Sequence, residues 1–155
     1  MRILVLSDAH GNINNIKRAI EREEAATKVF YLGDGANDML RLKEAYPKKE
    51  FIVVKGNNDI GSIPEIYLGF VSGIKTIALH GHRQYVKYNL DRLYFLALEN
   101  EAKIVLYGHT HTPDTTYQNG VYFLNPGALY GISPTYMVID FEKNGIMPII
   151  KHLNI

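Results

Sequence analysis

The sequence predicts an α/β fold, and three features of the chain point to it. In the first third of the chain, short aliphatic runs rich in β-branched residues alternate with segments whose apolar residues recur at helical spacing. Each of the first three aliphatic runs ends in a loop of polar residues and glycines, as the strands of a parallel sheet do at a ligand-binding edge. The rest of the chain is richer in strand and turn signals. We therefore expect sheets that are covered by helices.

The first half of the chain reads as two strand–loop–helix units followed by a third strand. Apolar residues between Ile13 and Ile20 form one stripe on a helix, and Asn12 or a neighbour is available as its N-cap. Pro47 ends the second helix, because proline cannot continue one. The expected strands cover residues 2–6, 28–32 and 51–54, and the expected helices run from about 14 to 24 and from 38 to 46.

The second half begins with a hairpin, in which two apolar runs flank the turn signal Ser72-Gly73. A helical stripe from Leu90 to Leu98 follows. The remaining strands are separated by turns that contain Asn and Gly. The expected strands cover residues 66–71, 74–79 and 103–107, a segment around Tyr117, and residues 121–124, 136–141 and 147–150.

The first strand of this hairpin is apolar at positions that point to both faces of a sheet. Ile66, Leu68 and Phe70 alternate with Tyr67 and Val71. Large exposed apolar patches mark interaction sites, so one face needs a partner. The sequence therefore predicts a homo-oligomer, a dimer or a tetramer.

Length and composition restrict the class of protein. The chain of 155 residues predicts a single domain over 1–155, and its 46% hydrophobic and 21% charged residues are typical of a globular protein. The first apolar run, 3–6, is too short for a signal peptide, and no window approaches a membrane span, so we expect no membrane partner and a cytoplasmic location. A formal charge of +1, with no basic stripe beyond Lys48-Lys49, does not favour nucleic acid as a partner or a nuclease activity.

Five clusters of potential metal ligands follow predicted strands. Cys is absent, which excludes thiolate metal sites and a cysteine nucleophile. Imidazole together with carboxylate oxygen suits Mn, Fe, Zn, Ni or Co rather than the all-oxygen cages of Ca. One such His alone would more often be structural, but five clusters in this arrangement indicate a metal site. The clusters are Asp8 with His10, Asp34, Asn57, His80, and His109 with His111.

The order of these clusters resembles the calcineurin-like metallophosphoesterases. The shared motifs are Asp-x-His, Gly-Asp, Gly-Asn-x-Asp, a strand-end His and Gly-His-x-His, and they cover nearly the whole chain. The segments 8–12 and 108–111 are most similar to the small prokaryotic phosphodiesterases of that superfamily. The resemblance implies a four-layer α/β/β/α sandwich of two mixed sheets.

The resemblance also implies a ligand set for two divalent metal ions per chain, which are Mn, Ni, Fe or Zn, with Mn favoured. Asp34 would bridge the two ions. Two divalent ions with only two carboxylates keep an excess of positive charge, which favours an anionic phosphate ester and a bridging hydroxide. The implied ligands are Asp8, His10, Asp34 and His111 for the first ion, and Asp34, Asn57, His80 and His109 for the second.

The implied function is binuclear-metal-dependent phosphodiesterase activity, in which the bridging hydroxide attacks a small phosphate ester. Asn58 is a candidate catalytic and substrate-binding residue, because larger members carry a proton-donating His at this position. An amide cannot donate that proton, so Asn58 either hydrogen-bonds the substrate or shapes the turn with Asp59. His82 and Arg83 are candidates for contact with the phosphate.

One alternative belongs to a different class of function. The same fold also serves as a non-catalytic protein-interaction scaffold in relatives that have lost metal ligands. The full set of ligand residues in this chain argues against that alternative.

Overall fold

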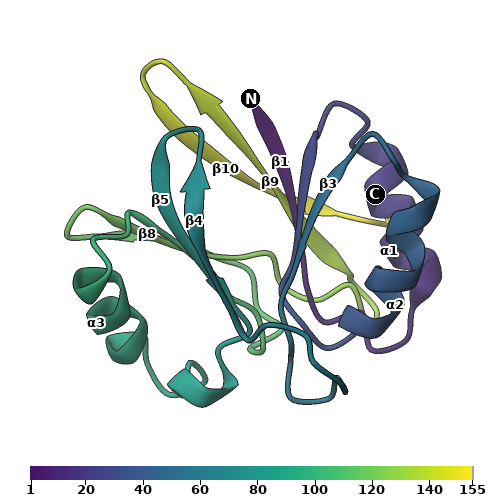
Figure 1. Ribbon diagram of the computed structural model, residues 1–155, viewed down its shortest axis with the longest axis horizontal. Helices are drawn as coiled ribbons and strands as arrows, with labels where there is room; N and C mark the ends of the chain where they lie inside the picture. The colour runs from purple at the N-terminus through teal and green to yellow at the C-terminus, as the bar shows by residue number, and fades with distance from the viewer. Residues whose placement is uncertain (155) are drawn as a thin grey trace.

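The computed structural model describes residues 1–154, which form two five-stranded sheets packed face to face. Figure 1 shows α1 and α2 on the outer face of one sheet and α3 on the outer face of the other, so the molecule has four layers. This arrangement confirms the expected α/β/β/α sandwich. The three helices are α1 (Ile13–Arg22), α2 (Ala36–Leu42) and α3 (Asp91–Glu99), and two short 3-10 helices are η1 (Lys43–Ala45) and η2 (His82–Gln84).

The first sheet has the strand order β10-β9-β1-β2-β3. Its strands β1, β2 and β3 are parallel, as the strand–loop–helix units predicted, whereas β9 and β10 add antiparallel strands at one side. The carboxyl ends of the three parallel strands therefore meet at one edge. The strands are β1 (Arg2–Leu6), β2 (Lys28–Tyr31), β3 (Glu50–Val53), β9 (Thr135–Glu142) and β10 (Gly145–His152).

The second sheet has the order β4-β5-β6-β8-β7, in which β5, β6 and β8 are parallel. The predicted hairpin is the antiparallel pair β4–β5. A second antiparallel pair, β7–β8, closes the other side. The strands are β4 (Ile66–Val71), β5 (Ile74–Leu79), β6 (Ile104–Leu106), β7 (Asp114–Gln118) and β8 (Val121–Asn125).

The hydrophobic core lies in three layers, one between the sheets and one beneath the helices of each face. Strand β1 contributes to two of them: Ile3 and Val5 point between the sheets, and Leu4 and Leu6 point toward α1. Burial on both faces explains why this strand is a continuous apolar run rather than an alternating one. The core thus holds the strand that carries Asp8 rigidly in place.

The N-termini of the first two helices differ in how they are capped. The Asn12 side chain accepts a hydrogen bond from the Asn15 backbone, so the expected cap of α1 is confirmed. Helix α2 begins at Ala36, two residues earlier than predicted, and it ends at Leu42 before the 3-10 turn. A carboxylate from a later loop, Asp59, binds the amides of Gly35 and Ala36. A cap from a distant segment leaves no local signal, which explains the difference.

The two apolar faces of β4 have different surroundings. The face with Tyr67 and Val71 packs between the two sheets and is not available to a partner. The other face exposes Ile66, Leu68 and Phe70 on the outer strand of the sheet. The homo-oligomer that would cover this face stays a prediction.

Within residues 1–154, none of the helices has both the length and the hydrophobicity that crossing a membrane requires.

Candidate metal centre

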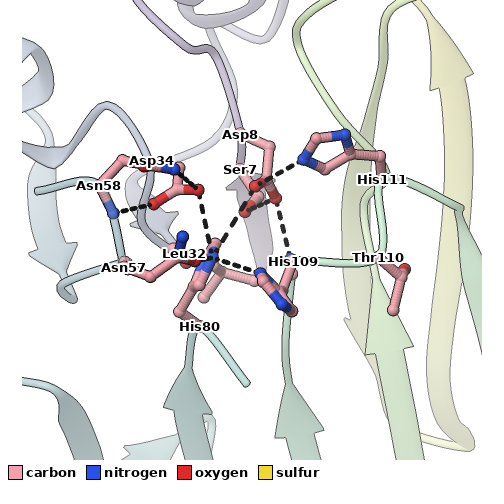
Figure 2. Close-up of polar contacts among 12 residues, drawn as sticks. Ser7, Asp8, Leu32, Asp34, Asn57, Asn58, His80, His109, Thr110 and His111 are labelled. Atoms are coloured by element: carbon pink, nitrogen blue, oxygen red, sulfur yellow. Dashed lines mark hydrogen bonds and ion pairs between the residues drawn. The ribbon is translucent and has the colours of Figure 1, made fainter. Parts of the chain in front are cut away.

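The predicted ligand residues lie together, at the edge where the carboxyl ends of the parallel strands of both sheets meet. Figure 2 labels all of them except His10. Loops after β1, β2 and β3 bring Asp8, His10, Asp34 and Asn57 from the first sheet. Loops after β5 and β6 bring His80, His109 and His111 from the second. Within each of two groups, Asp8–His10–His111 and Asp34–His80–His109, the ligand atoms lie within 4.8 Å of one another.

The first group joins one carboxylate and two imidazoles. The Nε2 atoms of His10 and His111 are 3.1 Å apart. Asp8 Oδ1 lies 3.2 Å from His111 Nε2 and 3.6 Å from His10 Nε2. Three potential ligand atoms therefore surround one point.

The second group is centred on the buried His80. Its Nε2 lies 3.0 Å from Asn57 Oδ1, 3.2 Å from His109 Nδ1 and 3.5 Å from Asp34 Oδ2. The opposite ring nitrogen, Nδ1, donates to the Leu32 carbonyl at 2.7 Å. This hydrogen bond selects the tautomer in which the Nε2 lone pair is free to bind a metal.

Asp34 lies between the two groups. Its Oδ2 is 3.8 Å from His10 Nε2 in the first group and 3.5 Å from His80 Nε2 in the second. Burial opposes ionisation of this carboxyl, but the contact with His80 and the Asn58 amide outweigh it and hold the pKa of Asp34 well below its usual value. An ionised carboxylate in this place can serve both groups.

The residues fit a pair of divalent ions. Asp8 Oδ1 and His82 Nδ1 are the two buried side-chain polar atoms of residues 1–154 that have no hydrogen-bond partner. A buried carboxylate oxygen without a donor is costly, and a cation would satisfy it. Two ligands bound at about 2.1 Å and at right angles lie about 3.0 Å apart, close to the spacings in both groups. The donor atoms are nitrogen and oxygen, which suits Mn, Fe, Ni or Zn.

Neighbouring groups orient the Asp8 carboxylate. Its Oδ2 accepts hydrogen bonds from the Ser7 hydroxyl at 2.5 Å and from the His109 backbone at 3.0 Å, which leaves Oδ1 to face the imidazoles. A Cβ on Gly108 would lie 2.2 Å from Ser7 Oγ and 2.9 Å from Asp8 Oδ2. Glycine at this position therefore lets the two sheets approach closely enough to share the site.

The pKa values of two histidines of the second group are shifted in opposite directions. Burial lowers the pKa of His80, but the carboxylates of Asp34 and Asp8 raise it more, so the net shift is upward. Burial and the neighbouring His80 lower the pKa of His109 to about 4. His109 is therefore neutral near pH 7, the form that binds a metal.

The backbone at the site is strained. Nine non-glycine residues of the described chain have positive φ, and five of them are predicted ligands. Such conformations cost free energy, and they persist where the surrounding structure holds a functional geometry. The five ligands are Asp8, His10, Asp34, His109 and His111.

The three predicted substrate contacts lie in different surroundings. The Asn58 amide group donates to Asp34 Oδ2 at 2.8 Å, a contact that the sequence did not indicate. The His82 ring centroid lies 5.5 Å from that of His80, beside the second group. Arg83 is mostly exposed and pairs with Glu65 at 2.9 Å, so it is not part of the ligand cluster.

Three supporting residues escaped the sequence analysis. Ser7 orients Asp8, as described above. Asn125 donates to the Gly108 carbonyl at 3.1 Å and to Thr110 Oγ1 at 3.0 Å, and so holds the loop of His109 and His111. Tyr130 places its ring centroid 5.5 Å from that of His10. Asn125 appeared in the sequence only as part of a turn signal, and nothing near Tyr130 marked it.

Asp59 organises the loops that carry Asp34 and Asn57. Its carboxylate accepts four backbone hydrogen bonds of 2.7–2.9 Å, from the amides of residues 34, 35, 36 and 56. Both oxygens are thereby occupied. The sequence suggested Asp59 as the partner of Asn58 in a local turn, whereas in the structure its carboxylate binds amides at the N-terminus of α2.

The substitution Asp59→Asn is expected to lower the free energy of unfolding by about 2–3 kcal/mol, because an amide group would face backbone donors. Urea unfolding of the metal-free protein measures this loss. The control Asp38→Asn removes an ion pair with the exposed Arg41 in the same helix and is expected to cost less than about 1 kcal/mol. Equal losses in the two variants would contradict the anchoring role of Asp59.

Comparison with known proteins places these features in context. The calcineurin-like phosphoesterase superfamily domain matches residues 1–144. A probable metallophosphoesterase of Bacillus subtilis is 30% identical over 132 residues, which cover 83% of this chain and 75% of the relative. A phosphodiesterase of Methanocaldococcus jannaschii is 28% identical over 97% of this chain and 99% of its own.

Solved structures show the same fold. A Streptococcus pneumoniae protein described as a predicted phosphoesterase has a TM-score of 0.81 and 28% identity, and the match covers 99% of this chain and 90% of that one. Vacuolar protein sorting 29 of Cryptosporidium parvum has a TM-score of 0.74 at 17% identity, over 97% of this chain and 96% of that one. At that identity, the second likeness concerns the fold alone.

Proposed function

The chain belongs to the calcineurin-like phosphoesterase superfamily, and from this premise we propose that it is a binuclear-metal-dependent phosphodiesterase acting on a small phosphate ester. One observation carries the proposal. Seven side chains from five loops converge as two groups of ligand atoms, with the Asp34 carboxylate between them. The similarity to a phosphodiesterase over 97% of the chain supports it.

In the proposed assignment, Asp8, His10, Asp34 and His111 hold one ion, and Asp34, Asn57, His80 and His109 hold the other. Two bound divalent ions supply a water of lowered pKa, sites for the phosphate oxygens and stabilisation of an in-line displacement. In the net reaction, a water oxygen bonds to phosphorus, the ester P–O bond breaks, and the leaving oxygen takes a proton.

The chain's own residues keep the ligands in the required state and leave one side open. The Leu32 carbonyl holds the tautomer of His80, and Ser7 orients Asp8. The side chains of Asp8 and His80 are fully buried, whereas those of His10 and His111 are 26% and 41% exposed. A substrate would approach from the exposed side, where the histidines face solvent.

The alternative, a non-catalytic interaction scaffold, rests on the likeness of fold to vacuolar protein sorting 29. Its consequence for this chain is a site that need not bind metal. The convergence of the ligand atoms and the buried unpaired oxygen of Asp8 favour the enzyme.

A hydrolysis panel separates the two functions. Metal-free protein is reconstituted with Mn, Ni, Zn or Fe(II), the last without oxygen, and is given bis(p-nitrophenyl) phosphate, p-nitrophenyl phosphate and cyclic nucleotides. We expect metal-dependent hydrolysis, faster for the diester than for the monoester. The variant His80→Asn serves as the control for contaminating phosphatase. Absence of hydrolysis with every metal, in folded protein that binds the metals, would contradict the proposed function.

A further inference from the structure

Two hollows adjoin the ligand cluster, one at each group of ligands, and their linings differ. The hollow beside His10 has a volume of about 590 Å³ and is lined by residues 10–14 and Tyr130. The hollow beside His80 measures about 230 Å³ and contains Glu65, His82 and Arg83. Apart from His10, the lining of the larger hollow contains no Asp, Glu, Lys, Arg or His. Because its lining is nearly free of charged side chains, the larger hollow suits an uncharged group better than the smaller hollow does.

The larger hollow contains an exposed aromatic ring next to a predicted ligand. Tyr130 is 56% exposed, and its ring meets that of His10 edge to face, with centroids 5.5 Å apart. Ile13 adds a partly exposed apolar side chain, and Asn12 and Asn14 add amide groups to the lining. Together they offer a surface for stacking, with hydrogen-bonding groups at its border.

The backbone before Tyr130 is held firmly. The Leu129 amide donates to the Ser7 carbonyl at 3.0 Å, and the Leu129 carbonyl accepts from the Asn15 side chain at 2.8 Å. Leu129 itself is fully buried beneath α1. The loop is therefore anchored both to the strand that carries Asp8 and to the helix that follows His10. An exposed aromatic side chain on an anchored backbone binds a flat group at low entropic cost.

We infer that this hollow binds a flat, uncharged aromatic group of the substrate, of the nucleobase kind, and that Tyr130 stacks on it. The inference rests on the proposed function and narrows its substrate class to phosphate esters that carry a nucleoside. Tyr130 is then a specificity-determining residue, because it contacts the nucleoside part of the ester while the metal site binds the phosphate. The base would be recognised by its face rather than by charge.

Two phosphate monoesters of ribose, one with a nucleobase and one without, test the inference. Adenosine 5′-phosphate and ribose 5-phosphate are titrated into the Mn-loaded protein by calorimetry. We expect the nucleotide to bind about tenfold more tightly, within the usual range for a base stacked on an aromatic side chain. Tyr130→Ala should remove this preference, Tyr130→Phe should keep it, and neither should change the affinity for ribose 5-phosphate.

A matched control comes from the other sheet. Tyr117 on β7 is 60% exposed, so Tyr117→Ala removes a ring of similar exposure away from the cluster and should leave the preference intact. Equal affinities of the two monoesters for the unaltered protein would overturn the inference, as would a preference that survives Tyr130→Ala. The diester panel is scored separately. If the protein hydrolyses diesters but binds both monoesters equally, only the inferred base subsite is wrong. If it prefers the nucleotide but hydrolyses no ester, only the proposed catalysis is wrong.

Discussion

Replacing Asp34 with Asn is expected to weaken both metal sites at once and to reduce the rate of diester hydrolysis by about a thousandfold. Asp34 Oδ2 lies 3.8 Å from His10 Nε2 and 3.5 Å from His80 Nε2, so its charge serves both groups. Loss of a properly held metal pair removes several kcal/mol of transition-state stabilisation, and each 1.36 kcal/mol is worth about tenfold in rate. Mn titration followed by elemental analysis gives the number of ions per chain.

The fold should survive this change, because Asn retains an acceptor for the Asn58 backbone amide that Asp34 Oδ1 binds at 2.9 Å. Asp8→Asn is the matched variant, since it removes the same charge from a carboxylate in the first group alone. We expect about two ions per chain in the unaltered protein, about one tightly bound ion in Asp8→Asn, and none in Asp34→Asn. A single ion in the unaltered protein, or equal single-site losses in both variants, would refute the shared position of Asp34.

The sequence predicted most of the fold because its signals are local. Strand β1 is apolar throughout since it is buried on both faces, and Asn12 caps α1 from the adjacent position. The hairpin β4–β5 has the predicted bounds because a short turn determines its register. The predicted start of α2 was wrong because it depends on a non-local contact. Asp59, which binds the Ala36 amide, lies 23 residues later in the chain.

In the candidate site, too, the sequence predicted some residues and missed others. Parallel strands bring their carboxyl ends to one edge, so ligands that follow successive strands were predictable as a cluster. The residues that orient the ligands were not predictable, because no pattern distinguished Ser7 as the hydrogen-bond donor to its neighbour Asp8, and Asn125 reaches Gly108 across 17 positions of the chain. Tyr130 is in the same class, since a turn brings it beside His10, which lies 120 positions earlier in the chain.

The rate of hydrolysis is expected to depend steeply on the pKa of the leaving group, because Asn58 stands where larger relatives are expected to carry a proton donor. Its amide donates to Asp34 Oδ2 at 2.8 Å and has no acidic proton to give. An alkoxide of high pKa needs a proton to depart, whereas a nitrophenolate leaves unaided. A series of p-nitrophenyl, phenyl and alkyl diesters, measured in single turnovers, gives the slope of the chemical step.

Installing a proton donor by Asn58→His is expected to flatten this slope, and the structure limits by how much. Asp59 could orient the new imidazole only with a free oxygen, yet both of its oxygens accept backbone hydrogen bonds. We therefore expect alkyl diesters to gain about 10²-fold, the low end of what general acid catalysis supplies, and p-nitrophenyl diesters to gain little. Asn58→Gln, which alters the side chain without adding an acid, is the control and should leave the slope unchanged. If the unaltered protein cleaves aryl and alkyl diesters at similar rates, the leaving oxygen is served by another donor and this role for position 58 is wrong. His82, whose Nδ1 is buried without a partner in the described chain, would then be the first residue to replace.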